Sequence, residues 1–474
     1  MKRDTSSQAD LSAFDRYAEY TDLDALKAYS TQPLRKCIRF NKLKSSKEAF
    51  SAWAKKKGWN LKPVPWCSEG FYIDRSDREE ALGKDLMHLL GHMYLQEAAS
   101  MLPVALLDPQ PGERILDMSA APGSKTTQIA SAMGQQGVII ANDMDEKRLR
   151  TLQDALSRSG VVNVIMTKKK GQWFGRYMTG RFDRVLIDAP CTAQGTLRKD
   201  PTALQYTSEH SIGKAAKLQR ELMESAIHST KIGGRIVYST CTLAPEENEE
   251  IVAWALQKFN GLIEPESLKS WKELKQGVKD ATAVRDTGGN CVRLWPQTYD
   301  TEGFFCAVLK KVGPTADLEP VKFVRFREEL INKGRTSQLR EFIQKHHGVH
   351  CIADKDMIYD RGDQLVLATQ EVSKFKMPAV DYSVGLPLGR TVRDCPLYLS
   401  HEMATLRCDD ATNHVCDLDD DQLQKYLEGA NVDCSDDLLG HSLVRYKGIC
   451  IGRGRAREGK LKNHLPRWVV GHAQ

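Results

Sequence analysis

The chain has 474 residues, of which 41% are hydrophobic and 27% are charged, and its formal net charge is +6. This composition is typical of a globular protein of about three domains, and it excludes collagen-like and wholly disordered classes. No segment approaches the ~18 consecutive apolar residues of a membrane helix. The N-terminus also lacks the apolar core of a signal peptide. We therefore expect a cytoplasmic protein with no membrane partner.

The 12 cysteines are scattered and form no CxxC pair. In a long chain without a signal peptide, this pattern predicts reduced thiols rather than disulfides. Cys408, His414 and Cys416 lack the spacing typical of zinc ligands, so we expect no metal site. The cysteines leave room for one or two catalytic thiols.

Basic residues concentrate near both ends of the chain. Residues 35–57 contain nine basic residues and one acid, and residues 445–474 contain eight and one. Residues 409–437 reverse the balance, with ten acids against one lysine. Either basic patch alone is better explained as solvated surface, but the two together indicate a polyanionic partner contacted at both ends.

The predicted elements begin with a small α+β domain over residues 1–92, with strands at 38–44 and 66–73. From about residue 102, apolar strands alternate with amphipathic helices, which predicts βαβ units and a mostly parallel, doubly wound α/β sheet. The strands of this region are predicted at 114–120, 138–143, 163–167, 182–190, 234–240 and 304–312.

Three helix starts in this region have clear signals. One helix is predicted from Ser124, and a second is capped by Asp145 and closed by Gly160. A third is predicted from Pro245, where four following glutamates would complement the helix dipole.

The remainder of the chain predicts two smaller units. Residues 313–384 are interpreted as a connector and a small α+β subdomain. The residue pattern changes at Gly385, where GLPLGR begins, and the short strands and basic segment of residues 385–474 predict a compact β-rich domain. Residues 93–312, between these units and the N-terminal domain, form the α/β domain.

A cofactor loop is predicted where the strand at 114–117 ends. The following residues, MSAAPGSKT, are small and include Gly123, so the backbone can approach a ligand just before a helix. The pyrophosphate fingerprint GxGxxG is absent. Asp143 ends the next strand, where an acid can bind ribose hydroxyls. The pattern fits an adenosyl cofactor without phosphates, and a tight turn with a solvated acid explains the loop alone equally well.

Two cysteines follow neighbouring predicted strands. Cys191 comes directly after Asp188-Ala189-Pro190, and Cys241 lies in Ser239-Thr240-Cys241-Thr242. A lone cysteine is most often a core residue. However, parallel strands end at one edge of the sheet, so both thiols, Asp188 and the cofactor loop should face one crevice.

A thiol, a carboxylic acid and an adenosyl cofactor together suit methylation of a pyrimidine at C5. A thiolate that adds to C6 pushes electron density onto C5, which can then accept a methyl group. A base removes the C5 proton and the thiolate leaves. Because thiolate formation needs an electropositive site, Lys125 is a candidate contributor.

At these residues the sequence resembles the RNA cytosine-C5 methyltransferases of the NOL1/NOP2/Sun (RsmB/NOP) family. The tail, with GLPLGR and LKNHLP, is similar to the PUA-like domain of its RsmF-like bacterial branch. The segments that carry the resemblance are PLRKCIRFNKLK (33–44), YLQEAASMLPVALL (94–107), LDMSAAPGSKTTQIA (116–130), FDRVLIDAPCTAQGTLRKDP (182–201) and GGRIVYSTCTLAPEENEEIV (233–252).

The resemblance implies a Rossmann-like class I methyltransferase domain that uses S-adenosyl-L-methionine. It implies a 16S rRNA substrate in the assembled small ribosomal subunit, with the decoding-region cytosine at position 1407 as the target. We expect the protein to act as a monomer.

The resemblance also implies roles for individual residues. Cys241 would attack C6, Cys191 would assist product release, and Asp188 would contact N3 and the amino group of the cytosine. The expected cofactor residues are Ser119, Ala120, Ala121, Pro122, Gly123, Ser124, Lys125, Asp143, Lys170 and Asp188. The expected RNA contacts are Arg198 and Lys199, for which a solvated loop is an equal alternative, and Arg453, Arg455, Arg457, Lys460 and Lys462.

Three residues depart from the family pattern. Ser119 replaces a usual cysteine and Ser124 replaces a common glycine, and both are small. Lys170 stands where the family usually has an aspartate that accepts from the adenine amino group, and a lysine cannot accept. The sequence therefore predicts reduced cofactor affinity unless a neighbour substitutes.

Three other functions remain in view. The same chemistry could act on tRNA. A ribosome-assembly factor that binds RNA without catalysis is favoured only by Lys170. A DNA cytosine methyltransferase is disfavoured, because those enzymes use the cysteine of the Pro-Cys motif as nucleophile and would leave Cys241 without a role.

Overall fold

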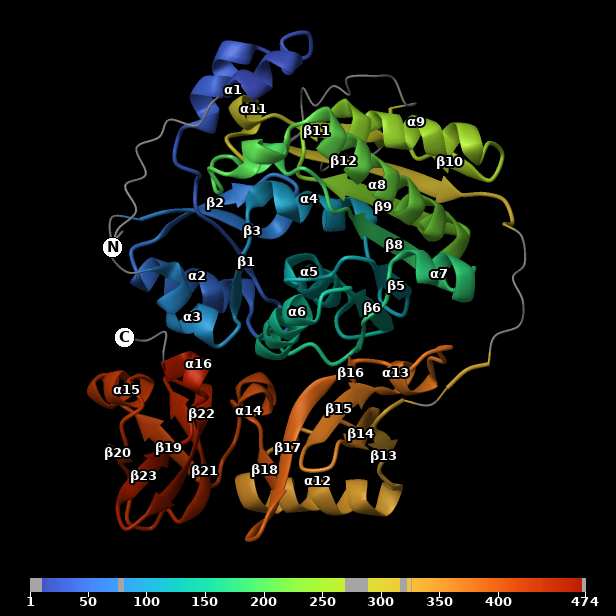
Figure 1. The fold of residues 1–474 in the computed structure, drawn as a ribbon. Coiled ribbons are helices and arrows are strands. Elements are labelled where there is room, and N and C mark those ends of the chain that lie inside the picture. The colour runs from blue at the N-terminus through green and yellow to red at the C-terminus, as the bar shows by residue number, and fades with distance from the viewer. Residues whose placement is uncertain (1–10, 76–80, 269–288, 316–321, 325, 471–474) are drawn as a thin grey trace.

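The computed structural model describes residues 11–75, 81–268, 289–315, 322–324 and 326–470, so the first ten residues of the predicted N-terminal domain lie outside it. Two lobes are visible (Figure 1): the upper one holds a four-stranded and a nine-stranded sheet, and the lower one holds two five-stranded sheets. Within the described ranges, none of the helices combines the length and apolar character needed to cross a bilayer.

The N-terminal module is an antiparallel sheet in the order β2-β3-β1-β4 with two helices packed beside it. Its core contains the close-packed rings of Phe40, Phe50 and Phe71. Two earlier helices, η1 and α1, pack instead against Leu197, Leu243 and Trp295 of the following α/β domain. The elements are η1 (Leu11–Tyr17), α1 (Leu23–Ser30), β1 (Cys37–Phe40), α2 (Lys47–Lys56), β2 (Asn60–Val64), β3 (Cys67–Asp74), η2 (Leu82–Lys84), α3 (Leu86–Leu89) and β4 (Met93–Leu95).

The central sheet contains five parallel strands in the order β7-β6-β5-β8-β9, and antiparallel β12 extends it beside β9. Helices α4, α5 and α6 contribute to the core on one face, and α7, α8 and α9 to the core on the other. The predicted doubly wound α/β class is therefore confirmed. The strands are β5 (Arg114–Asp117), β6 (Val138–Asn142), β7 (Val164–Thr167), β8 (Phe182–Asp188), β9 (Thr230–Thr240), β10 (Ile263–Pro265), β11 (Cys291–Leu294) and β12 (Phe304–Lys311).

The helices of this domain begin close to their predicted positions. The Asp145 side chain accepts hydrogen bonds from the amides of Lys147 and Arg148, and left-handed Gly160 ends the helix. The helix predicted from Pro245 begins instead as a short 3₁₀ turn, followed by α9. The helices are α4 (Ala98–Leu107), α5 (Ser124–Met133), α6 (Glu146–Ser159), α7 (Gln172–Tyr177), η3 (Gln194–Thr196), η4 (Ala203–Tyr206), α8 (Glu209–Ser229), η5 (Pro245–Glu247), α9 (Glu249–Lys258) and α11 (Pro296–Tyr299).

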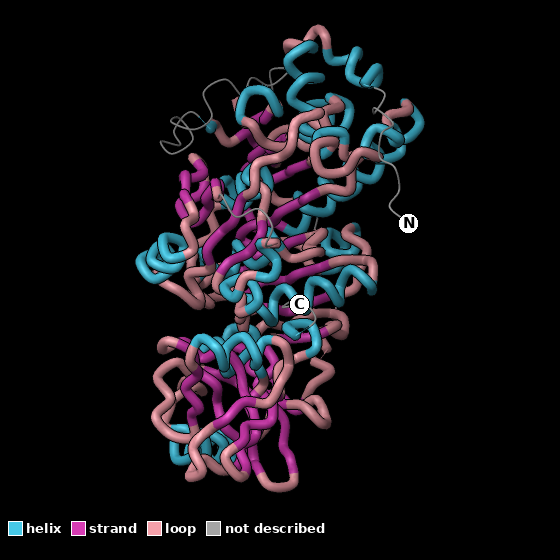
Figure 2. Tube along the Cα trace, turned by 90° about the vertical axis from the view of Figure 1, so that its left-hand side faces the viewer, coloured by secondary structure: helices cyan, strands magenta, loops and turns pink. Residues whose placement is uncertain are grey.

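The lower lobe contains the sheets β13-β14-β15-β17-β18 and β19-β21-β22-β23-β20. In Figure 2, helices lie between its strands and the upper lobe. The elements are β13 (Glu329–Leu330), α12 (Lys333–His347), β14 (Asp356–Asp360), β15 (Leu365–Thr369), α13 (Gln370–Lys374), β16 (Ser383–Val384), β17 (Leu386–Val392), β18 (Cys395–Leu399), α14 (His401–Arg407), β19 (Val415–Leu418), α15 (Asp420–Leu427), β20 (Val432–Asp433), β21 (Gly440–Tyr446), β22 (Ile449–Arg457), β23 (Lys460–Asn463) and α16 (Arg467–Val470).

The division expected between residues 384 and 385 falls inside one sheet, because β15 pairs with β17 across it. The short β16 joins the edge of the nine-stranded sheet beside β7. Gly385 lies between β16 and β17 with φ of +56°, and a Cβ there would sit 2.1 Å from the Leu367 carbonyl oxygen. The glycine therefore marks a tight passage from one sheet to another rather than the start of a domain.

Candidate active site

A cavity of about 370 Å³ opens where β5, β8 and β9 end. The strand order reverses between β5 and β8, and doubly wound sheets bind ligands at such a switch point. The cavity brings together the predicted cofactor loop, one predicted catalytic thiol and Asp188. Its lining is Tyr94, Leu95, Gln96, Glu97, Ser100, Ser119, Ala120, Ala121, Pro122, Ser124, Lys125, Arg148, Asp188, Ala189, Thr196, Lys199, Cys241, Glu302 and Phe304.

The two predicted catalytic cysteines are in contact. The sulfur atoms of Cys191 and Cys241 lie 3.4 Å apart, within hydrogen-bond distance for thiols. Both side chains are partly exposed, and Cys241 lines the cavity. The hydrogen bond to Cys241 and burial raise the pKa of Cys191 well above the ordinary value of a thiol. Cys191 therefore stays protonated and can donate its S–H to Cys241.

Lys125 and Asp188 form a charge pair beside the thiols. The Nζ of Lys125 lies 2.7 Å from Asp188 Oδ2 and donates to Ser100 Oγ at 3.2 Å. The other oxygen of Asp188 accepts from Ser239 Oγ at 2.9 Å. Burial opposes the charge of Lys125, but the Asp188 carboxylate outweighs it and raises the pKa of Lys125. The site therefore holds a fixed positive charge beside the Asp188 carboxylate.

A buried glutamate, Glu247, ties the two cysteine loops together. Its carboxylate accepts from the Thr192 amide at 3.1 Å, from Gln219 Nε2 at 2.8 Å and from Thr242 Oγ1 at 3.2 Å. Thr192 follows Cys191 and Thr242 follows Cys241, so one side chain holds both. The sequence assigned Glu247 to the start of a helix, and no local signal distinguished it from the neighbouring glutamates.

The predicted cofactor residues divide into two groups. Ser119, Ala120, Ala121, Pro122, Ser124, Lys125 and Asp188 line the cavity, whereas Gly123, Asp143 and Lys170 do not. Asp143 is buried behind the loop, where Oδ2 accepts from the Ala121 amide at 3.3 Å and lies 3.3 Å from Arg148 Nη1. Gly123 has φ of +110°, and a Cβ there would press on Ala155 of α6. Both residues thus shape the loop.

Lys170 is exposed at the end of the segment that follows β7. Arg148, which is not among the predicted cofactor residues, lines the cavity and donates to the Ala121 carbonyl at 2.6 Å. It lies in the first turn of α6, just after the Asp145 cap, and no sequence signal separated it from the other charged residues of that helix.

Arg198, a predicted RNA contact, is engaged within the protein. Its side chain is only 2% exposed and pairs with Asp300 at 2.8 Å. Its other N–H groups donate to the carbonyls of Gln32, Pro33 and Thr301. A basic residue in a polar loop suggested a solvated cation, but these partners instead fix the loop to the N-terminal segment. The adjacent Lys199 is exposed and lines the cavity.

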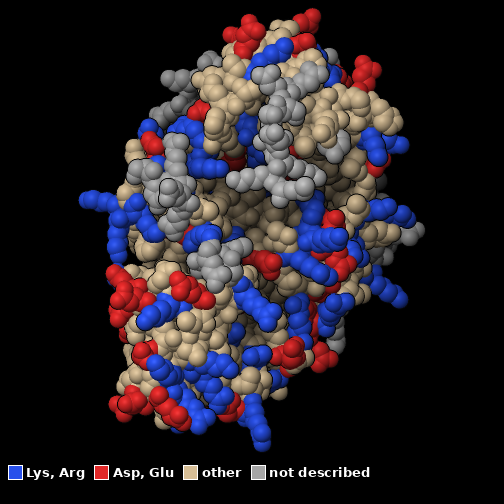
Figure 3. Space-filling view, turned by 60° about the vertical axis from the view of Figure 1, so that its left-hand side comes forward, with Lys and Arg blue, Asp and Glu red and all other residues tan. Residues whose placement is uncertain are grey.

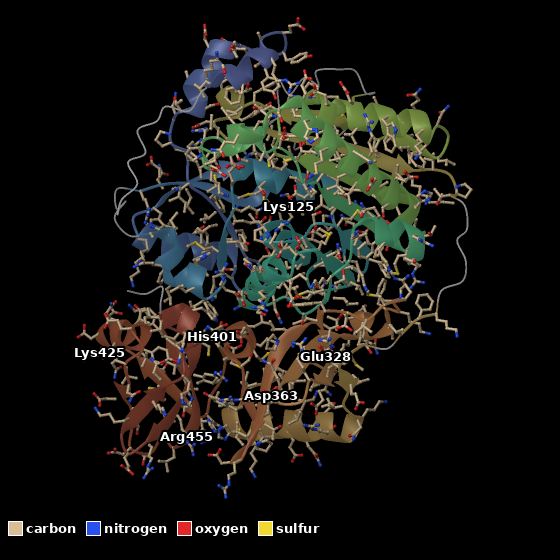
Figure 4. All side chains as sticks on the ribbon, in the orientation of Figure 1. Lys125, Glu328, Asp363, His401, Lys425 and Arg455 are labelled. Carbon is tan, nitrogen blue, oxygen red and sulfur yellow. The ribbon has the colours of Figure 1, made fainter. Side chains whose placement is uncertain are left out.

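The predicted C-terminal contacts lie on one sheet. Arg455 pairs with Lys462 and Arg457 with Lys460 across β22 and β23, so all four share a face, and all are exposed. Arg453 differs: its guanidinium lies 4.3 Å from the Tyr398 ring and donates to the Leu399 carbonyl, which joins the two lower sheets. Basic side chains of the lower lobe are interspersed with acids (Figure 3). Figure 4 places Arg455 in the lobe below Lys125.

Three family descriptions match successive parts of the chain. Residues 15–98 match the N-terminal domain of 16S rRNA methyltransferase RsmF. Residues 104–310 match 16S rRNA methyltransferase RsmB/F, and residues 413–470 match the RsmF PUA domain. The predicted β-rich, PUA-like C-terminal domain is therefore confirmed.

Similar sequences and solved structures also match rRNA methyltransferases and methyltransferase homologues. The ribosomal RNA small subunit methyltransferase F of Psychromonas ingrahamii is 35% identical over 94% of this chain and 92% of that protein. That of Aeromonas hydrophila is 37% identical over 95% and 94%. The crystal structure of a methyltransferase homologue from Pyrococcus horikoshii is 34% identical, with a TM-score of 0.53 over 64% of this chain and 99% of that one.

The fold is also shared with the structure of NSun6 from Pyrococcus horikoshii with SFG, which is 24% identical, with a TM-score of 0.54 over 65% of this chain and 98% of that one. The relatives match nearly the whole length, and the matched regions include the N-terminal, catalytic and PUA parts in order. The chain therefore belongs to the RsmF-like branch of the RsmB/NOP family of rRNA methyltransferases.

Proposed function

We propose that this protein transfers a methyl group from S-adenosyl-L-methionine to C5 of a cytosine in 16S rRNA, through a covalent adduct with Cys241. The observation that carries the proposal is the pair of thiols 3.4 Å apart, next to the Lys125–Asp188 charge pair. One thiol is needed to form a C6 adduct, and a second group is needed to resolve it. The similarity of the chain to small-subunit rRNA methyltransferases supports 16S rRNA as the substrate class.

The cavity fits an adenosyl amino acid. Its volume lies in the range of roughly 300–1,000 Å³ that small-molecule sites occupy. The first turn of α5 presents backbone amides suited to a carboxylate, and Asp188 and Ser100 offer acceptors for an ammonium or hydroxyl group. When bound, S-adenosyl-L-methionine supplies an electrophilic methyl group. Ser119 to Lys125 and Asp188 would hold it, with Asp143 and Gly123 shaping the loop.

The reaction begins when the Cys241 thiolate forms a bond to C6 of the cytosine. The electron pair of the C5–C6 double bond then becomes available at C5, while Asp188 contacts the N3 edge of the ring. Lys125 contributes positive charge beside this carboxylate and favours a thiolate in the cavity. Once C5 carries the methyl group and the demethylated cofactor has left, the C5 proton would pass to Cys191 as Cys191 gives its own proton to Cys241. The electron pair of the C5–H bond re-forms the C5–C6 double bond, and the C6–sulfur bond breaks with its electron pair on Cys241.

Cys191 acts in this last stage. Because its pKa is raised, it is a thiol at neutral pH and does not compete as a nucleophile. Its position against Cys241 lets it donate its proton to the Cys241 thiolate as the C6–sulfur bond breaks. Glu247 holds the Cys191 and Cys241 loops in position for this proton transfer.

The exposed basic face of β22 and β23 is proposed to dock RNA phosphates. Removing residues 385–474 would not test this docking role cleanly, because it would take β17 and β18 away from the sheet that they share with β13, β14 and β15. Replacing Arg457, Lys460 and Lys462 with serine is cleaner. We expect weaker rRNA affinity and a shallower dependence on salt, by about 0.7–0.9 in log–log slope for each lost phosphate contact. An unchanged salt dependence of rRNA affinity would mean that this face does not contact RNA phosphates.

The decisive experiment measures transfer of a labelled methyl group to small ribosomal subunits that lack the modification, followed by mapping of the labelled nucleotide. We expect label on one decoding-region cytosine, at position 1407. Label on tRNA instead would mean that the substrate is tRNA. Subunit binding without any label would favour an RNA-binding assembly factor. Naked 16S rRNA tested in parallel shows whether the assembled subunit is required, and gel filtration with light scattering tests the expected monomer.

A further inference from the structure

A carboxylate that no part of the proposed mechanism uses lines the same cavity. Glu302 is only 6% exposed, and its Oε1 is a buried oxygen without a hydrogen-bond partner in the described structure. Its neighbour Glu97 is different, because its two oxygens accept from the amides of Glu302 and Ser100. Burial and the Glu302 carboxylate raise the pKa of Glu97 to about 8. An unsatisfied buried acceptor is costly, so the free oxygen of Glu302 calls for a donor from a ligand.

Glu302 belongs to the thiol side of the cavity rather than to the cofactor loop. Gly303 donates to the Gly195 carbonyl at 2.9 Å, and Gly195 in turn donates to the Cys241 carbonyl at 2.9 Å. Phe305 pairs with Thr240, the residue before Cys241. Burial raises the pKa of Glu302, and the positive charges of Lys199, Lys125 and Arg198 oppose this shift. Glu302 therefore comes from a segment joined to the Cys241 loop, and it lines the same cavity as Cys241 and Asp188.

We infer that Glu302 accepts a hydrogen bond from the exocyclic amino group of the target cytosine and makes the site select cytosine over uracil. The amino group carries two hydrogens, so this contact is compatible with the one that the family resemblance gives to Asp188. Uracil presents a carbonyl oxygen at the same position, which would face the carboxylate without a hydrogen. Sites built around such donors reject analogues that lack them, because the buried acceptor is left unpaired.

The inference rests on the proposed function, and a double-substitution cycle tests it. The enzyme change is Glu302→Met, which keeps the length of the side chain and removes the acceptor. The substrate change replaces the target cytosine, in reconstituted small subunits, with pyrimidin-2-one, which lacks only the amino group. The kcat/KM for methyl transfer is measured for all four combinations, and cofactor Kd is measured by calorimetry.

Removal of the amino group takes away the contacts of both Glu302 and Asp188 in the wild-type enzyme, but only the Asp188 contact in Glu302→Met. The loss in kcat/KM should therefore be about 10–100-fold larger for the wild type than for Glu302→Met, the size of one hydrogen bond to a charged acceptor. Glu302→Gln, which keeps a neutral acceptor, should fall between them. The exposed Glu264→Gln variant should match wild type and controls for loss of a charge.

An equal loss in wild-type and Glu302→Met enzymes would overturn the inference. So would a weakened cofactor Kd with the amino dependence intact, since the carboxylate would then serve the cofactor. If Glu302→Met does not fold, as judged by thermal unfolding, an unreduced amino dependence in Glu302→Gln overturns it instead. If the wild-type enzyme fails to methylate subunits that carry the natural target cytosine, the proposed function itself is wrong. This outcome is distinct from failure of the inference about Glu302.

Discussion

The sulfur atoms of Cys191 and Cys241 meet at 3.4 Å although 50 positions separate the residues in the chain. The parallel pairing of β8 and β9 explains this contact. Asp188 is in register with Ser239, so the chain continues beyond both strands from the same edge of the sheet. Three residues after Asp188 and two after Ser239, the thiols reach the same point. Glu247 then fixes the loops beyond it.

This geometry predicts different outcomes for the two cysteine variants. Cys241→Ala removes the proposed nucleophile, so it should form no RNA adduct and reduce methyl transfer by several orders of magnitude. Cys191→Ala should still form the C6 bond but release product slowly, so that a covalent RNA–protein complex accumulates. Denaturing gel electrophoresis with labelled rRNA distinguishes them.

Buried Cys306 offers a matched control, because it is a cysteine of the same sheet outside the cavity lining. Cys306→Ala should form and resolve the adduct as wild type does. Accumulation of adduct by Cys241→Ala and not by Cys191→Ala would exchange the two roles.

Much of this site could be predicted from the sequence, for a reason that lies in the topology. Strand ends of a parallel sheet meet at one edge, so Asp188, Cys191 and Cys241 could be placed together from their positions after apolar strands. Arg198 and Glu247 could not be placed this way. Both are charged residues in polar segments, and their partners, the carbonyls of residues 32 and 33 and the amide of Thr192, are distant in sequence or lie in a loop without periodicity.

Lys170 supplies a prediction about the cofactor. The structure exposes this side chain outside the cavity lining, and a lysine cannot accept from an adenine amino group. We expect Lys170→Asp to lower the Kd for S-adenosyl-L-methionine, by about tenfold for one added hydrogen bond to a charged acceptor. Titration calorimetry measures it, with exposed Lys168→Asp as a control for charge. Equal Kd values for wild type and Lys170→Asp would mean that another group already serves the adenine.

Arg198 and Lys199 are adjacent basic residues with opposite expected behaviour. Arg198→Ala removes the partner of the half-exposed Asp300 and leaves three backbone carbonyls without their donor, so it should destabilise the fold by about 1–3 kcal/mol. Lys199→Ala should leave stability within about 0.5 kcal/mol, because its side chain is exposed. Only Lys199→Ala should weaken RNA affinity with a reduced salt slope while the fold is intact. Denaturant titration and filter binding separate the two effects, and the reverse pattern would restore Arg198 as the RNA contact.

Lys44 joins the two lobes and predicts a pH-dependent stability. Its Nζ donates to the Leu90 carbonyl at 2.8 Å and to Thr405 Oγ1 of α14 at 2.9 Å. Burial lowers the pKa of Lys44 to about 7. In the unfolded chain the group titrates near pH 10.4. Between these values the unfolded state binds more protons than the native state, so the contribution of Lys44 to stability rises with pH, by up to about 1.4 kcal/mol per unit.

The comparison with Lys44→Met isolates this contribution from those of other groups. Below pH 7 both states of the wild type carry the proton, and the native state bears the full cost of a buried charge. Above pH 7 that cost is relieved, so the difference in unfolding free energy between wild type and Lys44→Met should shift in favour of wild type from pH 7 to pH 9. Urea titrations at several pH values measure it, with exposed Lys55→Met as the control. A pH-independent difference would mean that Lys44 stays charged in the native state and that its two oxygen acceptors suffice to hold the proton.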